Sequence, residues 1–118
     1  MPTLLALHHP PFFTGIAHMD RMGLLEGAAG LEAVLRRHPQ VERVICGHLH
    51  RTIVRRFADT VVMTVPSTAH QIALDLRADA PPAWLMEPPG FAVHALRDGA
   101  LVSHVAAAGE HGPDRLFG

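Results

Sequence analysis

The sequence of 118 residues contains no lysine, no asparagine and no tyrosine, and it has a single cysteine. One cysteine excludes an internal disulfide, so we expect a reducing, cytoplasmic compartment and a buried, inert thiol at Cys46. The formal net charge of −1 gives no electrostatic reason to expect nucleic acid or an anionic membrane as a partner. No apolar run approaches the ~20 residues that span a bilayer, and no basic segment of a secretory signal follows Met1.

Length and composition are those of one globular domain, residues 1–118. Apolar residues make up 48% of the chain, a normal proportion for a protein that buries a core. Ten histidines is a high count for this length. We expect three of them, His38, His104 and His111, to be ordinary surface residues.

The first half of the chain predicts a crossover unit. Residues 4–7 and 41–46 are short apolar runs, typical of buried strands. Between them, residues 24–38 have apolar side chains at helical spacing and stop at Pro39. A helix between two such strands favours parallel pairing of the strands. Residues 12–23 are expected to form a long loop, and long loops in compact domains often bind ligands.

The second half predicts antiparallel structure. Residues 52–57, 61–65 and 71–76 are β-rich, and proline pairs at 81–82 and 88–89 interrupt the pattern. Residues 91–96 and 100–105 flank Asp98-Gly99, a pair that favours a tight hairpin turn. We expect the tail, residues 106–118, to be irregular.

Histidines stand where the predicted strands end. His8 and His9 follow the first strand, and Gly47-His48-Leu49-His50 follows the second. Neighbouring parallel strands end at one edge of a sheet, where α/β proteins bind ligands. In an extended backbone, residues two apart point the same way, so His48 and His50 would project together. His8, His48 and His50 could then form a metal site, because imidazole is a common ligand of zinc, iron and manganese. The alternative is that they are strand-end histidines without a metal.

These stretches resemble the C-terminal half of the calcineurin-like metallophosphoesterases. The resemblance is carried by residues 7–11, by Met19-Asp20 in the loop, and by residues 46–50. The closer branch is that of the bacterial class III cyclic-nucleotide phosphodiesterases and glycerophosphodiesterases, which residues 66–71 and 87–94 also resemble. The resemblance implies an α/β (α+β) fold, which would be the C-terminal half of a four-layer α/β/β/α sandwich.

The resemblance also implies roles for individual residues. His8 and His48 would bind one metal ion of a two-metal site, and His50 would bind the other. His70 matches a histidine that lines the substrate pocket near the phosphate, although a polar residue without a ligand would look the same. His9 is expected to orient its neighbours or touch the substrate.

The loop that borders this pocket contains His18 and Asp20. His18 could face the pocket or be a solvated loop residue. Asp20 could instead cap or pin the loop.

The implied chemistry is hydrolysis of a small phosphodiester, a 3′,5′-cyclic nucleotide or a glycerophosphodiester. It needs a strong nucleophile and neutralisation of charge on the phosphoryl oxygens. Two iron, manganese or zinc ions about 3.5–4 Å apart supply both. Neutral imidazoles suit such ions, and carboxylates complete the charge balance.

Part of the family pattern does not occur in these residues. The motifs Asp-x-His, Gly-Asp and Gly-Asn-His, which carry the remaining ligands, are absent from the sequence. We therefore expect a partial domain, no complete catalytic set and at most partial metal occupancy. The chain could be a fragment, a mis-started reading frame or one half of a split protein.

Three functions remain open from the sequence. The first is a phosphodiesterase whose activity belongs to the full-length fold. The second is a non-catalytic module that binds metal or serves interaction. The third is a mononuclear hydrolase in which His8, His48 and His50 hold one zinc ion with an open position.

We expect the isolated chain to fold stably only with an N-terminal half, or by self-association, for example as a homodimer, over the same surface. The strand at residues 4–7 would otherwise expose a sheet edge and apolar faces. Size-exclusion chromatography and thermal melting of the purified chain test this. A sharp unfolding transition of a monomer would contradict it.

Overall fold

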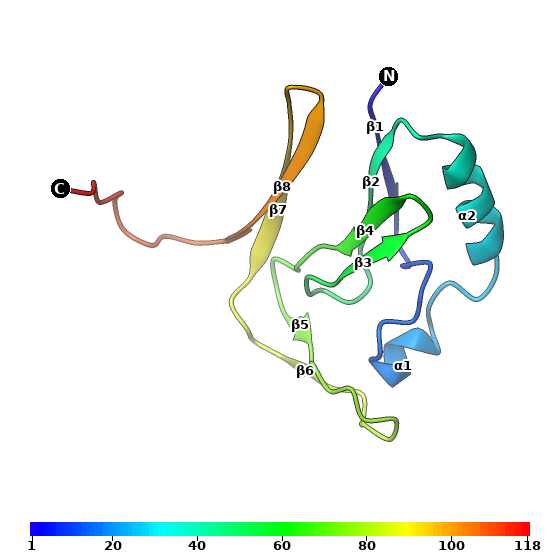
Figure 1. Ribbon diagram of the computed structural model, residues 1–118. Helices are drawn as coiled ribbons and strands as arrows, with labels where there is room; N and C mark the ends of the chain where they lie inside the picture. The colour runs from blue at the N-terminus through cyan, green and yellow to red at the C-terminus, as the bar shows by residue number, and fades with distance from the viewer.

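A parallel pair of strands joined by a helix forms the centre of the molecule (Figure 1). A computed structural model describes all 118 residues. Strand β1 (Thr3–Leu7) pairs in parallel with β2 (Val41–Cys46), and helix α2 (Ala28–Arg37) connects them. Strand β4 (Thr60–Thr64) lies parallel to β2 on its other side, and β3 (Val54–Phe57) pairs antiparallel with β4. The predicted crossover unit is confirmed, in a mixed sheet of order β1-β2-β4-β3.

Helix α2 is shorter than its periodicity predicts. It begins after Gly27, whose backbone is left-handed at φ 96°, and it ends before His38. The apolar residues at 24 and 25 belong to the preceding loop. The segment predicted to be a loop contains a single helical turn, α1 (Ala17–Asp20), which is too short to give a periodic signal. Neither helix has the length and apolar character needed to cross a bilayer.

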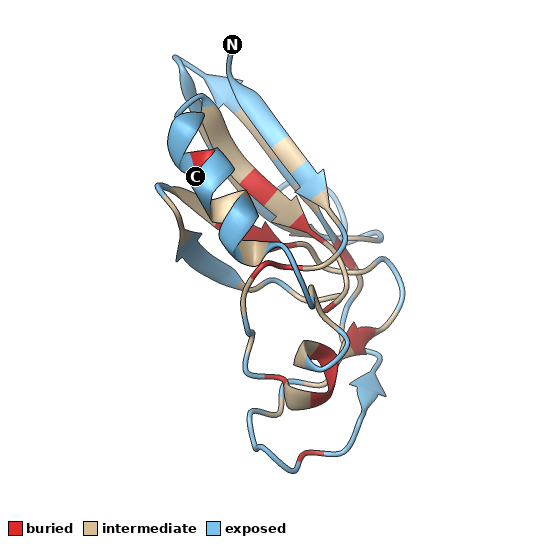
Figure 2. Ribbon diagram, turned by 90° about the vertical axis from the view of Figure 1, so that its right-hand side faces the viewer, coloured by how far each residue is buried: buried red, intermediate tan, exposed pale blue.

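The core lies between α2 and the sheet. Leu35 of the helix packs with Val44, Cys46 and Val62, which are all nearly inaccessible to solvent. Figure 2 shows this burial along the middle of the sheet, with exposed residues on the helix's outer side. Burial raises the pKa of the Cys46 thiol to about 12, so the group stays protonated and unreactive at neutral pH, as the sequence predicts.

Strand β1 is an edge strand. It has one neighbour in the sheet, and Leu4 is 41% exposed. Figure 2 shows most of β1 coloured as exposed. Its free side therefore presents unpaired backbone groups and apolar side chains to solvent.

A hairpin, β7 (Gly90–Arg97) and β8 (Ala100–Ala107), lies on the side of the sheet opposite α2 (Figure 1). Asp98 and Gly99 both have positive φ, 49° and 79°, which is the backbone of the tight turn predicted for this pair. Both strands run slightly beyond the predicted bounds. Of the tail predicted to be irregular, residues 106–107 instead belong to β8. Residues 108–118 form no helix or strand, as expected, and extend away from the body.

A short ladder joins β5 (Gln71–Ile72) to β6 (Trp84–Leu85). The prediction of a strand over residues 71–76 is wrong beyond Ile72. The chain turns there, since Asp75 N donates to Ala73 O at 3.1 Å and the Asp75 carboxylate accepts from Arg77. The sequence pattern misses β6 because its two residues stand between proline pairs.

One polar contact joins the hairpin to the sheet. Arg43 of β2 donates to the hydroxyl of Ser103, which forms a 2.7 Å hydrogen bond with Nδ1 of His94. Burial, and then the positive charge of Arg43, hold the pKa of His94 below its usual range. The neutral form of His94 is therefore favoured at pH 7, and its ring shares a hydrogen bond with the Ser103 hydroxyl.

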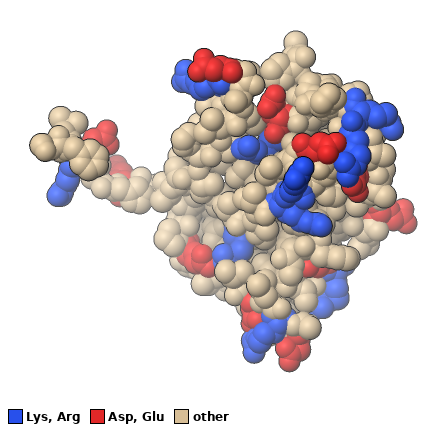
Figure 3. Space-filling model, in the orientation of Figure 1, with Lys and Arg blue, Asp and Glu red and all other residues tan.

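The surface charges do not gather by sign on the face seen in Figure 3, where acidic and basic side chains are interspersed.

We expect acid to loosen the hairpin. The unfolded chain binds a proton at His94 more readily than the folded chain, so the free energy of unfolding falls as the pH drops below about 6.5. Thermal melting at pH 7.5 and 5.5 should show a smaller loss of melting temperature in His94→Gln than in the wild type. His104→Gln, an exposed histidine of the same hairpin, is the control and should keep the full loss. Equal losses in all three proteins would contradict the assignment.

Candidate metal centre

Three histidines from two strand ends converge. His8 and His9 follow β1, and His48 follows β2; one ring nitrogen from each lies within 4.8 Å of the others. The ring centroids are 4.7 Å apart for His8–His9 and 4.6 Å apart for His9–His48. Of the predicted set His8, His48 and His50, the structure brings His8 and His48 together and leaves His50 outside this group. It adds His9, for which the sequence predicts an orienting role.

A backbone contact holds the two strand ends together. Gly47 N donates to His8 O at 3.0 Å, which continues the β1–β2 pairing past the last strand residues. A Cβ atom at position 47 would lie only 3.3 Å from His8 Nδ1. Glycine at this position therefore lets the His8 imidazole sit against the neighbouring backbone.

The turn at residues 47–50 is not extended. His48 and His50 have left-handed backbones, with φ of 71° and 59°. The expectation that both side chains project together from an extended strand end is therefore wrong. The physical reason is Leu49, which is fully buried and packs with Ile16 and Met19, so the chain must curl to turn this side chain inward.

The two histidines of this turn contact different parts of the chain. His48 Nε2 lies 3.1 Å from Met19 O, and His50 Nδ1 lies 3.1 Å from His70 O. A carbonyl oxygen only accepts, so the proton sits on Nε2 of His48 and on Nδ1 of His50. His48 keeps the lone pair of Nδ1 and His50 keeps that of Nε2. This is the arrangement in which a backbone carbonyl orients a metal-binding histidine.

His50 and His70 form a ring pair separate from the three-histidine group (His8, His9 and His48). Their ring centroids are 4.8 Å apart, and the ring of Trp84 lies 5.0 Å beyond His70. The segment that carries His70 is fixed by Gln71, whose buried side chain accepts from Ser67 N and donates to Ser67 O at 2.8 Å. Ser67 N also donates to His50 O at 2.8 Å. These contacts hold residues 66–71 against the turn at residues 47–50, which we call the histidine turn.

The three-histidine group suits one borderline metal ion. Burial, and then the charges that His48 and His8 would carry, lower the pKa of His9, which favours the neutral, ligating form. In a tetrahedral zinc site two bound nitrogens lie about 3.3 Å apart. Separations up to 4.8 Å would therefore have to close by side-chain rotation before all three rings bind one ion. The group contains no carboxylate, so it offers no bridging ligand for a second ion.

The loop before α2 is pinned by an acid. The Asp20 carboxylate accepts from Thr14 N and Thr14 Oγ1 at 2.8 Å and from Gly15 N at 2.9 Å. Of the two roles considered for Asp20, pinning the loop is the one that the structure supports. The idea of His18 as a solvated loop residue is wrong, because the residue is 7% exposed and its Nδ1 is buried without a partner.

A cavity of about 360 Å³ opens beside His48. Its walls are mainly apolar, with Phe12 and Met19 among them, and it also contains Asp20 and Arg55. The Arg55 guanidinium lies 5.2 Å from the centroid of the Phe12 ring and forms no ion pair. The sequence gives no signal for Arg55, which stands in an ordinary exposed strand.

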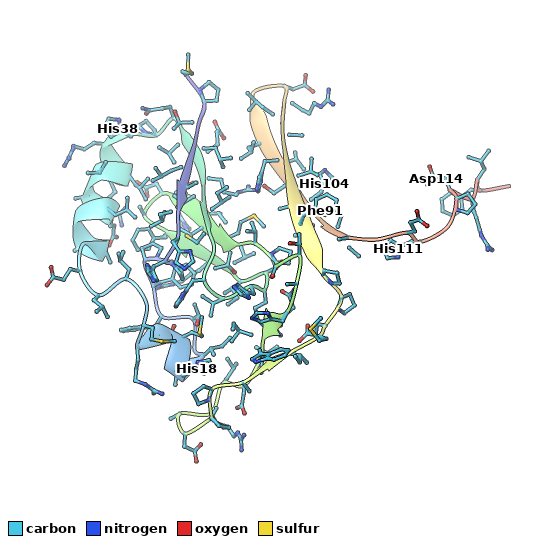
Figure 4. The ribbon with its side chains drawn as sticks, turned by 180° about the vertical axis from the view of Figure 1, so that it is seen from behind. His18, His38, Phe91, His104, His111 and Asp114 are labelled. Carbon is cyan, nitrogen blue, oxygen red and sulfur yellow. The ribbon has the colours of Figure 1, made fainter.

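The three histidines expected at the surface are there. His38, His104 and His111 are all exposed, and Figure 4 shows His38 near the end of α2, His104 on the hairpin and His111 on the tail.

No protein-family model matches the chain. Individual relatives do match. A probable glycerophosphodiester phosphodiesterase, GpdQ, from Arcobacter nitrofigilis is 39% identical over 108 residues, which are 91% of this chain and 40% of the relative. The glycerophosphodiester phosphodiesterase GpdQ of Enterobacter lignolyticus is 33% identical over 79% of this chain and 33% of its own length. A probable cyclic nucleotide phosphodiesterase of Synechococcus is 38% identical over 75% of this chain and 34% of its own length.

These relatives are all named phosphodiesterases, a group of hydrolases. Within that class, the chain matches the C-terminal portion of the class III branch that contains the glycerophosphodiester and cyclic-nucleotide enzymes. It spans between 33% and 40% of the length of these relatives.

We expect one ion per chain at the three-histidine group. Titration with cobalt(II), followed by visible absorption, should show His48→Ala weakening the first ion at least about tenfold, because a ligand is lost. His50→Ala should leave the first ion in place, since His50 lies outside the group. His38→Ala is the matched surface control. Equal affinity in wild type and His48→Ala would exclude this site.

Proposed function

We propose that this chain carries the histidine part of a metal-dependent phosphodiesterase site of the calcineurin-like kind. The substrate would be a small phosphodiester, a 3′,5′-cyclic nucleotide or a glycerophosphodiester, as the names of the relatives suggest. The observation that carries the proposal is the convergence of three imidazole nitrogens within 4.8 Å at the ends of two parallel strands.

The proposed assignment keeps two ions, of iron, manganese or zinc. His8 and His48 would hold one and His50 the other, with His9 beside them and His70 near the phosphate. When bound, such ions supply a nucleophilic hydroxide and neutralise charge on the phosphoryl oxygens. Three nitrogens already close together support the first ion. For the second, support comes from His50 Nε2, which is free to bind because Nδ1 is used by His70 O.

The protein's own part in this scheme is positioning. The carbonyl of Met19 fixes the ring of His48, and the carbonyl of His70 fixes the ring of His50. The cavity beside His48 has room for one ester arm of the substrate, with Phe12 as an apolar wall and Arg55 as an unpaired cation. Such a wall would hold an alcohol group next to the phosphate.

We further propose that residues 1–118 form part of one domain, whose complete form is the four-layer α/β/β/α sandwich. The exposed edge of β1 is where the remaining portion would pair. That portion would bring the carboxylates that the three-histidine group lacks. Pairing of two copies through the same edge is the competing arrangement, and the oligomeric state separates the two.

A second candidate is a non-catalytic module that binds one metal ion or docks another protein. The three-histidine group favours it, because it is sufficient for one ion without any further ligand. In this case, removal of the metal would lower the thermal stability of the protein, and no hydrolysis would be seen with or without the metal.

Hydrolysis of bis-(p-nitrophenyl) phosphate with manganese or zinc tests these proposals. We expect activity when a supplied N-terminal half from a relative is mixed with this chain, and loss of at least about a hundredfold in His48→Ala, since both ion binding and substrate alignment suffer. Activity of the lone chain would instead favour a mononuclear site. Metal binding without hydrolysis in either condition would favour the non-catalytic module. His38→Ala is the control for nonspecific damage.

A further inference from the structure

The only tryptophan of the chain stands at the outer end of a row of rings. Trp84 lies on β6, opposite Ile72 of β5, and remains 62% exposed. Its ring centroid is 5.0 Å from that of His70, with the planes tilted by 54°. The indole thus rests on an imidazole on one side and meets solvent over most of its surface. An exposed tryptophan is uncommon, because the indole gains more from burial than most side chains.

The inner end of the row is the histidine turn. The His70 ring lies 4.8 Å from that of His50, and His50 Nδ1 donates to His70 O. His50 is two residues from His48, so their Cα atoms are no more than about 7 Å apart. The row therefore leads from the three-histidine group outward to the open indole face.

Trp84 is held in place rather than left on a loose loop. Arg51, the residue after His50, donates from Nε to Ile72 O at 2.7 Å. Its Nη2 forms an ion pair with Glu87, and the Arg51 side chain is only 13% exposed. One half-buried guanidinium thus ties β5, and the segment that directly follows β6, to the turn at residues 47–50. A rigid platform loses little conformational entropy when a flat ligand settles on it.

We propose that Trp84 is a stacking platform for the base of a nucleotide whose phosphate lies at the histidine site. This rests on the proposed function and makes it narrower, because it selects a nucleoside phosphoester over a glycerophosphodiester. A nucleobase offers a π face to the indole, and glycerol offers none. Stacking of a base on an aromatic side chain changes affinity by about 5- to 150-fold.

Adenosine monophosphate, ribose 5-phosphate and adenosine are the probes, with zinc present. The chain has one tryptophan and no tyrosine, so its emission reports on Trp84 alone. Excitation at the red edge of the indole absorption avoids adenine. We expect adenosine monophosphate to quench this emission and to bind about tenfold more tightly than ribose 5-phosphate, which should leave the emission unchanged.

Calorimetric titration of variants supplies the second measurement. In Trp84→Leu, the affinity for adenosine monophosphate should fall to that for ribose 5-phosphate, which itself should not change. Trp84→Phe should retain part of the difference. Phe117→Ala removes a fully exposed aromatic side chain from the tail and is the matched control, with no expected effect.

The probes separate the failure of this inference from the failure of the proposed function. Equal binding of the two phosphates without quenching would overturn the platform and leave the phosphate site standing. Quenching by adenosine with no contribution from the phosphate would support the platform and count against the phosphodiesterase site. No quenching by any adenine compound would overturn the inference.

Discussion

The parallel pairing of β1 with β2 is the constraint on which the site depends. Val44 and Cys46 are buried against Leu35 and Val62, and this burial fixes which face of β2 points toward the helix. A slip by one residue would turn these side chains outward, so the register is strongly specified. Because the pairing continues through Gly47 and His8, the histidines that follow the two strands are brought together by the same force that forms the core.

The second half of the site depends on polar contacts more than on burial. Only 15 of 118 residues are buried, and the segments after β4 contribute few of them. Ser67, Gln71 and Arg51 connect the backbone of the turn at residues 47–50 with that of residues 66–72 and of the start of β7. Such contacts specify geometry well, but each adds only about 1 kcal/mol of net stability. The sheet and α2 are therefore stabilised by apolar burial, whereas the segments after β4 are positioned mainly by hydrogen bonds and are weakly packed.

Much of this arrangement could be predicted from the sequence. The strand at Val41–Cys46, the parallel crossover and the Asp98-Gly99 turn follow from local apolar patterns and turn chemistry, which act over a few residues. The curl of the turn at His48 could not be predicted, because it follows from the burial of Leu49 against α1, a contact distant in sequence. Trp84 was missed for a similar reason. Its neighbours in space, His70 and His50, are brought to it by hydrogen bonds that leave no periodic signal.

The left-handed backbone of the histidine turn also limits how the site can diversify. At φ of 71° and 59°, His48 and His50 occupy a conformation that asparagine and aspartate tolerate and that β-branched residues do not. Replacement by aspartate is therefore open to the backbone at both positions. It would exchange a nitrogen donor for a carboxylate oxygen and move the preference from zinc toward harder ions such as magnesium or manganese. The backbone of this turn thus permits a single substitution to replace a nitrogen donor of the proposed metal site by an oxygen donor.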